Sequence, residues 1–253
     1  MQRSEPHELV VSPLFKVEID GEERVLDAYT DEGYAVLANL WTRSGWQRKV
    51  SYEPTWLGIP VIQLPEDIVM MQELLWKVRP DVIIECGVAH GGALVLYASV
   101  FELLGKGKVV GVDVEIRKYN RLAIESHPLS HRITLIEGDS VSDDTVAEVT
   151  SHVRPGDRVL VALDSLHTKA HVAAELERYA PLVTPDSYLV VFDGVMAMLP
   201  DAPNGRPDWD VNNPLSALRE FVTQHEEFEV DPTYNRIGVS HCPEGFLRRR
   251  SES

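Results

Sequence analysis

Short hydrophobic runs alternate with amphipathic segments through the central part of the chain. Five such runs, rich in Val, Ile and Leu, predict buried strands. They span residues 82–86, 108–114, 133–136, 158–163 and 188–192. The segments between them have the apolar spacing of helices, over residues 93–104, 116–126, 143–153 and 170–179. Strict alternation of strand and helix predicts a parallel sheet covered by helices on both faces.

The first 65 residues follow a different pattern. They contain three of the five tryptophans and a predicted helix over 31–46. We expect residues 1–65 to form a lid, a substrate-binding segment or an oligomer contact, in front of a ligand-binding domain over 66–253. A further helix, predicted over 67–78, ends before Pro80.

The alternation stops after the fifth strand. Residues 194–212 are polar and interrupted by prolines, which indicates a long surface loop. A helix over 215–225 follows, with Asn213 as its cap. The last predicted elements are two closing strands, over 228–230 and 237–241, and a charged tail over 248–250.

Length, composition and charge narrow the class of protein. At 253 residues, 44% hydrophobic and 25% charged, the chain has the balance of a globular protein. Its 24 basic and 40 acidic residues give a formal charge of −16, so we do not expect nucleic acid as a partner. Two cysteines, Cys86 and Cys242, fit a reducing cytoplasm better than a disulfide framework. Residues 1–9 lack an apolar leader and no run approaches a membrane span, so we expect neither secretion nor a membrane partner.

Carboxylates and glycines gather at one edge of the predicted sheet. Ligands of open parallel sheets bind beyond the carboxyl ends of the strands, where the strand order reverses. The residues that the five strands bring to this edge are Glu85, Gly87, His90, Gly91, Gly92, Asp113, Glu115, Gly138, Asp139, Ser140, Asp164, Ser165, His167, Asp193 and Gly194. A sheet does not need acidic strand ends for its own stability, so this edge is the predicted ligand site.

The first two strand ends predict a cationic ligand that contains a ribose. The loop glycines let the backbone approach a ligand, although packing alone would also favour them. Their spacing departs from G-x-G-x-x-G, and Glu85 stands where a dinucleotide enzyme would bind pyrophosphate. Glu85 would repel phosphate and attract a cation, while Asp113 is placed to bind a ribose diol. S-adenosylmethionine has both features.

Two later strand ends predict a magnesium site and a general base. If the fourth and fifth strands are neighbours, about 4.8 Å apart, Asp164 and Asp193 can share one Mg²⁺. His167 is the predicted base, because a neutral imidazole can accept the proton of an aliphatic hydroxyl. His171 and His90 are second choices. The alternatives are ordinary acidic strand ends and a helix-capping histidine.

Several motifs together resemble the class I methyltransferases. These are Glu85-x-Gly87-x-x-x-Gly91-Gly92, Gly111-x-Asp113 and Gly138-Asp139-Ser140. A narrower set resembles the cephalosporin hydroxylase and rhamnosyl O-methyltransferase family. It consists of Trp56-Leu57-Gly58, Pro65-x-Asp67, Arg79-Pro80-Asp81, Cys86-Gly87-x-x-His90-Gly91-Gly92 and Pro243-x-Gly245-Phe246-Leu247-x-Arg249. The resemblance implies a Rossmann-like α/β fold, with a seven-stranded sheet of five parallel strands plus a terminal hairpin.

The same resemblance implies S-adenosylmethionine and Mg²⁺ as cofactors and a sugar, glycoside or oligosaccharide as methyl acceptor. It assigns the metal to Asp164 and Asp193, proton transfer to His167, and a homo-oligomer as the assembly. The residues expected to bind S-adenosylmethionine are Glu85, Gly87, His90, Gly91, Gly92, Asp113, Glu115, Gly138, Asp139, Ser140 and Asp164. Metal-binding relatives often have Glu-Asp after the fifth strand, whereas this chain has Phe192-Asp193 and so one ligand fewer.

Other functions stay open on the sequence alone. A hydroxylase, or an accessory subunit of an oxidative enzyme, would need a redox metal, and the chain has no two-His-one-carboxylate set at a convincing spacing. A non-catalytic module that binds S-adenosylmethionine would explain the missing glutamate. A nicotinamide oxidoreductase is disfavoured by Glu85.

Overall fold

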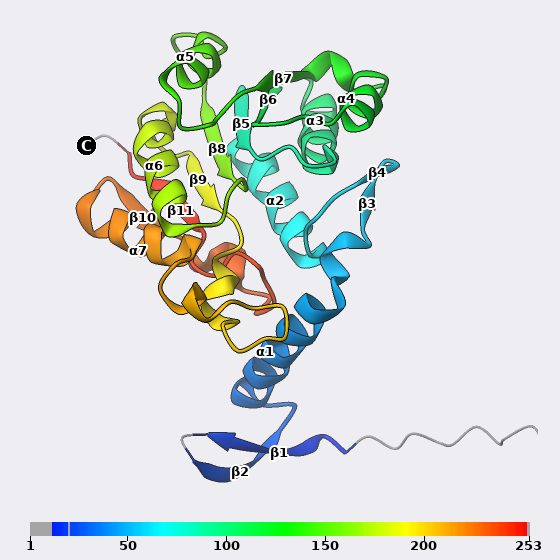
Figure 1. The fold of residues 1–253 in the computed structure, drawn as a ribbon, viewed down its shortest axis with the longest axis vertical. Helices are drawn as coiled ribbons and strands as arrows, with labels where there is room; N and C mark the ends of the chain where they lie inside the picture. The colour runs from blue at the N-terminus through cyan, green and yellow to red at the C-terminus, as the bar shows by residue number, and fades with distance from the viewer. Residues whose placement is uncertain (1–11, 20, 252–253) are drawn as a thin grey trace, which may run out of the picture.

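The five hydrophobic runs form parallel strands in the computed structural model of the protein, which describes residues 12–19 and 21–251. The strands are β5 (Val82–Cys86), β6 (Lys108–Asp113), β7 (Ile133–Glu137), β8 (Val159–Leu163) and β9 (Tyr188–Val191). The sheet order is β10-β11-β9-β8-β5-β6-β7 (Figure 1). Every residue of β5, β8 and β9 is buried, as expected for strands covered on both faces. The chain winds away from β5 in both directions, so a crevice lies at the carboxyl ends of β5 and β8.

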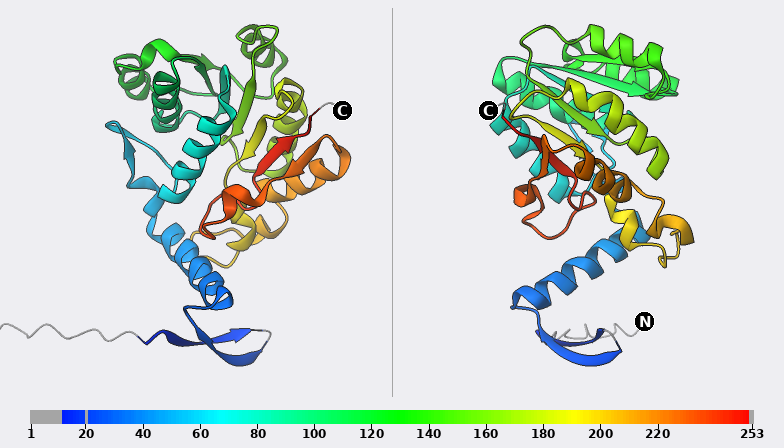
Figure 2. Two further views of the ribbon diagram at one scale, coloured as in Figure 1. Left: turned by 180° about the vertical axis from the view of Figure 1, so that it is seen from behind. Right: turned by 90° about the vertical axis from the view of Figure 1, so that its left-hand side faces the viewer.

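Helices cover both faces of the sheet and make three layers (Figures 1 and 2). The helices α2 (Pro65–Val78), α3 (Gly92–Leu104) and α4 (Lys118–Glu125) contribute to one hydrophobic core. The helices α5 (Asp143–Ser151), α6 (Lys169–Tyr179) and α7 (Pro214–Gln224) contribute to the other. Ser142, Thr168 and Asn213 cap the last three helices by accepting a bond from a backbone N–H of the first turn. The predicted α/β fold class is confirmed.

The closing hairpin differs from the prediction in its second strand. It consists of β10 (Phe228–Val230) and β11 (Phe246–Arg249), and β11 pairs antiparallel with β9. The strand predicted over 237–241 is wrong, because that segment is a loop bound to α2. Asp67 accepts a bond from the Ser240 hydroxyl (2.6 Å) and another from the backbone N–H of His241 (2.8 Å). These bonds take the backbone out of reach of the sheet ladder.

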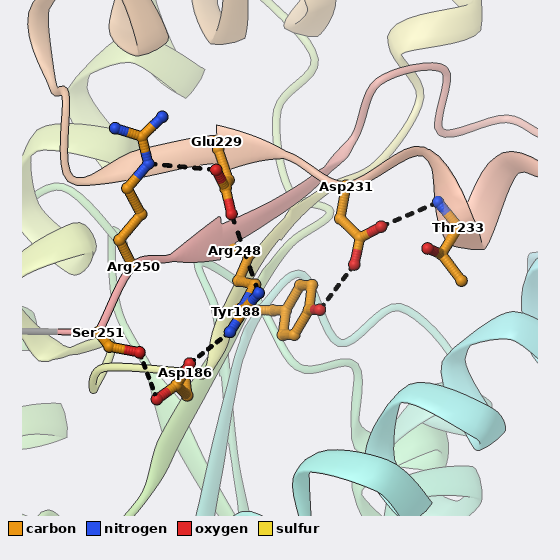
Figure 3. Close-up of polar contacts among 8 residues, drawn as sticks. All are labelled: Asp186, Tyr188, Glu229, Asp231, Thr233, Arg248, Arg250 and Ser251. Carbon is orange, nitrogen blue, oxygen red and sulfur yellow. Dashed lines mark hydrogen bonds and ion pairs between the residues drawn. The ribbon is translucent and has the colours of Figure 1, made fainter.

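The arginines predicted as a charged tail instead lie along and after β11 (Figure 3). Arg248 pairs with Asp186 (2.5 Å), which lowers the pKa of that carboxyl, and Arg250 pairs with Glu229 (3.1 Å). These ion pairs therefore link the C-terminal strand β11 and the residue after it to β10 and to the turn before β9.

The N-terminal part extends away from the sheet. A hairpin of β1 (Leu14–Ile19) and β2 (Glu22–Asp27) lies beyond the far end of α1 (Asp31–Arg48) in all three views (Figures 1 and 2). A second small hairpin joins β3 (Thr55–Trp56) to β4 (Ile59–Pro60). The first hairpin was not predicted, although Phe15, Val17 and Ile19 alternate with Lys16 and Glu18 in β1; its partner strand β2 is mostly exposed and has no such alternation.

In the part of the chain that the structure describes, no helix has the length and apolar character to cross a membrane. The expectation that residues 1–9 are no secretion leader concerns a segment outside the described residues.

Candidate active site

A cavity of about 580 Å³ opens beyond the carboxyl ends of the parallel strands. Its lining includes Gly87, Asp113, Asp139, Ser140, Asp164, His167 and Asp193, all of which were predicted site residues. A smaller cavity of about 30 Å³ adjoins the glycine loop and is lined by Glu85, His90, Gly91 and Gly92, with Gly87 and Asp164 common to both. The strand ends therefore meet at one site, as the sequence predicted.

Two predicted cofactor residues lie outside the linings of both cavities. Glu115 is exposed on the loop after β6. Gly138 makes room for a neighbouring helix, because a Cβ at this position would lie 2.4 Å from the Thr145 hydroxyl. Gly138 is thus required by packing, and the structure does not bring Glu115 to the ligand cavity.

The glycine loop fits too closely against its surroundings to accommodate side chains. Gly87 has a φ of +106°, and a Cβ there would lie 2.0 Å from the carbonyl oxygen of Asp164. A Cβ on Gly92 would lie 2.2 Å from the carbonyl oxygen of Pro60. The loop therefore packs tightly between the residue after β8 and the last residue of β4.

We expect Gly87→Ala to lower the free energy of unfolding by about 2–5 kcal/mol, because it adds a backbone clash to left-handed strain. Gly105→Ala is the matched control, since Gly105 also has a positive φ (+69°) but nothing lies within 4 Å of its Cβ position. Urea unfolding of both variants measures the difference. Equal losses in the two variants would show that the close approach to Asp164 costs nothing.

Asp113 is held by the glycine loop. Its Oδ2 accepts bonds from the backbone N–H groups of Val88 (2.9 Å) and Ala89 (3.2 Å). The carboxylate still lines the large cavity. His90 pairs with the side chain of Asn120 on α4 (3.3 Å) and does not line the large cavity, so it is poorly placed to act as the base.

A buried carboxylate that the sequence analysis missed organises the wall beside Ser140. Glu175 of α6 is fully buried, and its Oε1 accepts bonds from the hydroxyls of Ser140 (2.6 Å) and Ser165 (2.6 Å). His171 lies 3.3 Å from the same oxygen, and this contact raises the pKa of His171. His171 therefore belongs to a wall network. The sequence signal that could have identified Glu175 is its position four residues after His171 on the same helix.

Asp164, His167 and Asp193 form the cluster expected of a metal or proton-transfer site. One ligand atom from each lies within 4.8 Å of the others, and this is the one such group of three among residues 12–19 and 21–251. The predicted pairing of the fourth and fifth strands is confirmed, since β8 pairs with β9. Phe192, which occupies the position of the glutamate in metal-binding relatives, is 2% exposed and packs in the core. The third residue of the group is therefore His167.

The charges of this cluster suit a divalent cation. Burial, followed by the nearby Asp193 carboxylate, raises the pKa of Asp164 well above its usual range. Two close carboxylates repel each other, and a cation between them would relieve that repulsion. The donor set has two carboxylates and one imidazole, which differs from the two-His-one-carboxylate set of non-haem iron oxygenases.

Asp193 has an unusual backbone for a residue other than glycine, with a φ of +54°. Its two carboxylate oxygens face different histidines. Oδ2 lies 3.3 Å from Nε2 of His167, and Oδ1 lies 3.5 Å from Nδ1 of His241. His241 is buried, at 4% exposed. Only the binding of its loop by Asp67 brings it here.

Unsatisfied polar atoms mark the small cavity as a place for a ligand. Glu85 is fully buried, and its Oε1 accepts a bond from the Tyr97 hydroxyl (3.2 Å). Its Oε2 and both amide atoms of Gln63 have no hydrogen-bond partner among the described residues. Burial raises the pKa of Glu85 to about 8. An ammonium group bound here would donate to the Glu85 and Gln63 oxygens, and an acceptor on the same ligand, such as a carboxylate, would pair with the Gln63 amide nitrogen.

The strand order, the helices on both faces and the acidic, glycine-rich edge together define a class I methyltransferase. Residues 48–250 match the family described as Rhamnosyl O-methyltransferase/CmcI, and the chain belongs to this family. The family predicted from the sequence motifs is therefore confirmed.

Named relatives agree with this assignment. The Rhamnosyl O-methyltransferase of Mycobacterium leprae is 31% identical over 202 residues, which cover 78% of this chain and 83% of that protein. The protein of the same name from Mycobacterium tuberculosis is 28% identical over 204 residues, covering 77% and 78%. An apo structure of CmcI superposes with a TM-score of 0.57 at 19% identity, covering 79% of this chain and 78% of that one. A CmcI structure described as Mg-SAM also has a TM-score of 0.57, at 18% identity.

Proposed function

We propose that this protein transfers the methyl group of S-adenosylmethionine to a hydroxyl of a sugar or glycoside. Family membership supports the enzyme class, an S-adenosylmethionine-dependent O-methyltransferase, and the names of the relatives support a sugar acceptor. The observation that carries the proposal is the cluster of Asp164, His167 and Asp193 in the wall of the cavity that the predicted cofactor residues also line.

S-adenosylmethionine fits the two adjoining cavities. We place its ribose at Asp113 and its adenine beside Asp139 and Ser140. Its ammonium lies next to Glu85 and Gln63, whose unsatisfied atoms border the small cavity. A cationic donor suits this acidic lining better than a phosphate-bearing one would.

Methyl transfer to oxygen is an in-line displacement. A lone pair of the acceptor oxygen forms the new C–O bond as the C–S bond breaks, which leaves S-adenosylhomocysteine and a methyl ether. His167 accepts the hydroxyl proton, and the Asp193 carboxylate 3.3 Å away orients the imidazole and stabilises the imidazolium that forms. Asp164 and Asp193 would hold a magnesium ion, which when bound supplies Lewis-acid polarisation of the acceptor hydroxyl.

Calorimetric titration with S-adenosylmethionine, with Mg²⁺ and then with a chelator, tests the proposal. We expect a dissociation constant in the micromolar range or tighter, with methylation of alkyl glycosides stimulated by Mg²⁺. Asp164→Asn should remove the stimulation, whereas Asp144→Asn, at an exposed carboxylate on α5, should not. Absence of S-adenosylmethionine binding would refute the proposal. Binding without methylation of any glycoside would favour a non-catalytic module, and bound iron with a hydroxylated product would favour the oxidative alternative.

We also infer that the segment before residue 66 joins copies of the protein into a homo-oligomer in the cytoplasm. Several large apolar side chains of the first hairpin, α1 and the turn between them are exposed: Leu14, Val25, Tyr29, Leu37, Leu40 and Trp41. The two free cysteines are buried, in keeping with a reducing compartment. Light scattering of the purified protein should give a mass of at least twice 28.4 kDa. A monomeric mass would contradict the assembly.

A further inference from the structure

A third cavity, of about 240 Å³, adjoins the large one on the side of the metal-ligand cluster. The two cavities have Tyr52, Ile62 and Asp193 in common. A molecule in the third cavity could therefore extend a hydroxyl to Asp193 and His167 while S-adenosylmethionine occupies the large and the small cavity. At roughly 30 Å³ per water molecule, the space corresponds to about eight waters, which is enough for one sugar ring.

Aromatic rings form much of the wall of this third cavity. Trp46 of α1 packs edge-on against His241 with ring centroids 5.3 Å apart, and against Trp209 with centroids 5.8 Å apart. Tyr52 follows on the short turn after α1. Sugar rings present an apolar C–H surface that packs well on aromatic side chains, which contribute large contact area at low entropic cost.

A few polar groups complete the wall. Asn204 of the 194–212 loop and Lys49 at the end of α1 also line the cavity and can bond to hydroxyls on the edge of a sugar. A mostly apolar pocket with a few placed polar groups is the usual form of a small-molecule site. Lys49 is the one Lys or Arg among the described residues that line either cavity, against carboxylates at Asp113, Asp139, Asp164 and Asp193. This balance favours a neutral glycoside over a sugar that carries a diphosphate.

The two segments that make this wall are joined to each other. Arg43 of α1 donates a bond to the carbonyl of Met198 (2.6 Å) and forms an ion pair with Asp201. The carbonyl of Trp209 accepts a bond from Asn213, the cap of α7 (2.7 Å). The wall is therefore preorganised by contacts between α1, the 194–212 loop and the main domain.

We propose that the cavity between Trp46, Tyr52, Asn204 and His241 is the acceptor subsite and binds one neutral sugar ring of a glycoside. This inference rests on the proposed function and deepens it, since it names where the acceptor binds and by which groups. The family match begins at residue 48, so Trp46 contributes to acceptor binding from outside the matched region.

Saturation-transfer NMR and calorimetry with methyl α-L-rhamnoside and other alkyl glycosides, in the presence of S-adenosylhomocysteine, test the subsite. We expect Trp46→Ala to weaken glycoside binding about tenfold or more, and Trp46→Phe to keep most of it. The dissociation constant of S-adenosylmethionine should stay the same in both variants. Trp76→Ala is the matched control, because Trp76 is an exposed tryptophan on α2 and is absent from the described linings of both cavities.

The outcomes separate the subsite from the proposed function. If S-adenosylmethionine binds but no glycoside of the panel does, the subsite is refuted and the enzyme class stands. Unchanged glycoside binding in Trp46→Ala, with the thermal unfolding of the variant matching wild type, also refutes it. Tighter binding of a nucleoside diphosphate sugar than of the alkyl glycosides would overturn the preference for a neutral acceptor. If the wild-type protein does not bind S-adenosylmethionine, the proposed function itself is refuted.

Discussion

Replacing His167 by alanine is expected to lower kcat by about 10²–10⁴-fold, the usual range for loss of a general base. The dissociation constant of S-adenosylmethionine should stay the same, because the imidazole acts on the acceptor proton and does not hold the methyl donor. Its position supports this separation. His167 lines the large cavity and lies 3.3 Å from Asp193, which lines both the large cavity and the proposed acceptor cavity. Steady-state kinetics with an alkyl glycoside and calorimetry with S-adenosylmethionine measure the two quantities.

Two comparisons make the result specific to proton transfer. His152→Ala should leave kcat unchanged, because His152 ends α5 and is not among the residues described around either cavity. If His167 is a metal ligand instead, saturating Mg²⁺ should restore much of the lost activity in His167→Ala. The base assignment is wrong if kcat and cofactor affinity fall together, if neither falls, or if Mg²⁺ restores the rate.

In the ligand-free protein, we expect Glu85→Gln to have a higher free energy of unfolding than wild type, by a margin that grows as the pH rises from about 4.5 to 8. Burial raises the pKa of the Glu85 carboxyl from 4.5 to about 8. Between these values the folded state binds a proton that the unfolded state has lost, so the free energy of unfolding falls with rising pH. Glutamine keeps the acceptor for Tyr97 and cannot ionise. At 1.4 kcal/mol per pKa unit, the advantage of the variant over wild type should grow by about 3–5 kcal/mol across this window.

Urea unfolding at pH 5 and pH 8 measures this difference. Asp67→Asn is the matched control, because Asp67 is also buried, with a pKa raised to about 7. Asp67 is absent from the described linings of the large cavity and of the small cavity beside Glu85. It should show the same sign of pH dependence. An advantage of Glu85→Gln that is the same at both pH values would refute the assigned ionisation.

The same residue should link cofactor binding to proton release. If the ammonium of S-adenosylmethionine lies next to Glu85, binding at pH 7 ionises a carboxyl that was protonated in the free protein. Calorimetry in two buffers of different ionisation enthalpy should then detect a released proton, and affinity should increase from pH 6 to pH 8. Glu85→Gln should bind more weakly and release no proton, while Asp67→Asn should behave as wild type. Absence of proton release in the wild-type protein would place the ammonium elsewhere.

The sequence by itself determined the sheet and the residues at its edge. Hydrophobic runs of strand length that alternate with helical segments have few alternatives to a parallel sheet covered on both faces. The carboxyl ends of parallel strands meet at one edge whatever the loops do. This geometry is why Asp113, Asp139, Asp164 and Asp193 could be expected to gather around one cavity, and the structure brings them there.

Only the tertiary structure decided the contacts made by loops and by the N-terminal segment. Asp67 binds the 237–241 loop and so replaces a predicted strand with the turn that places His241 beside Asp193. Glu175 accepts hydrogen bonds from Ser140 and Ser165, which follow two different strands. Trp46 reaches the site only because α1 packs on the 194–212 loop. Such contacts join residues far apart in the chain and depend on side-chain fit, for which hydrophobic periodicity has no signal.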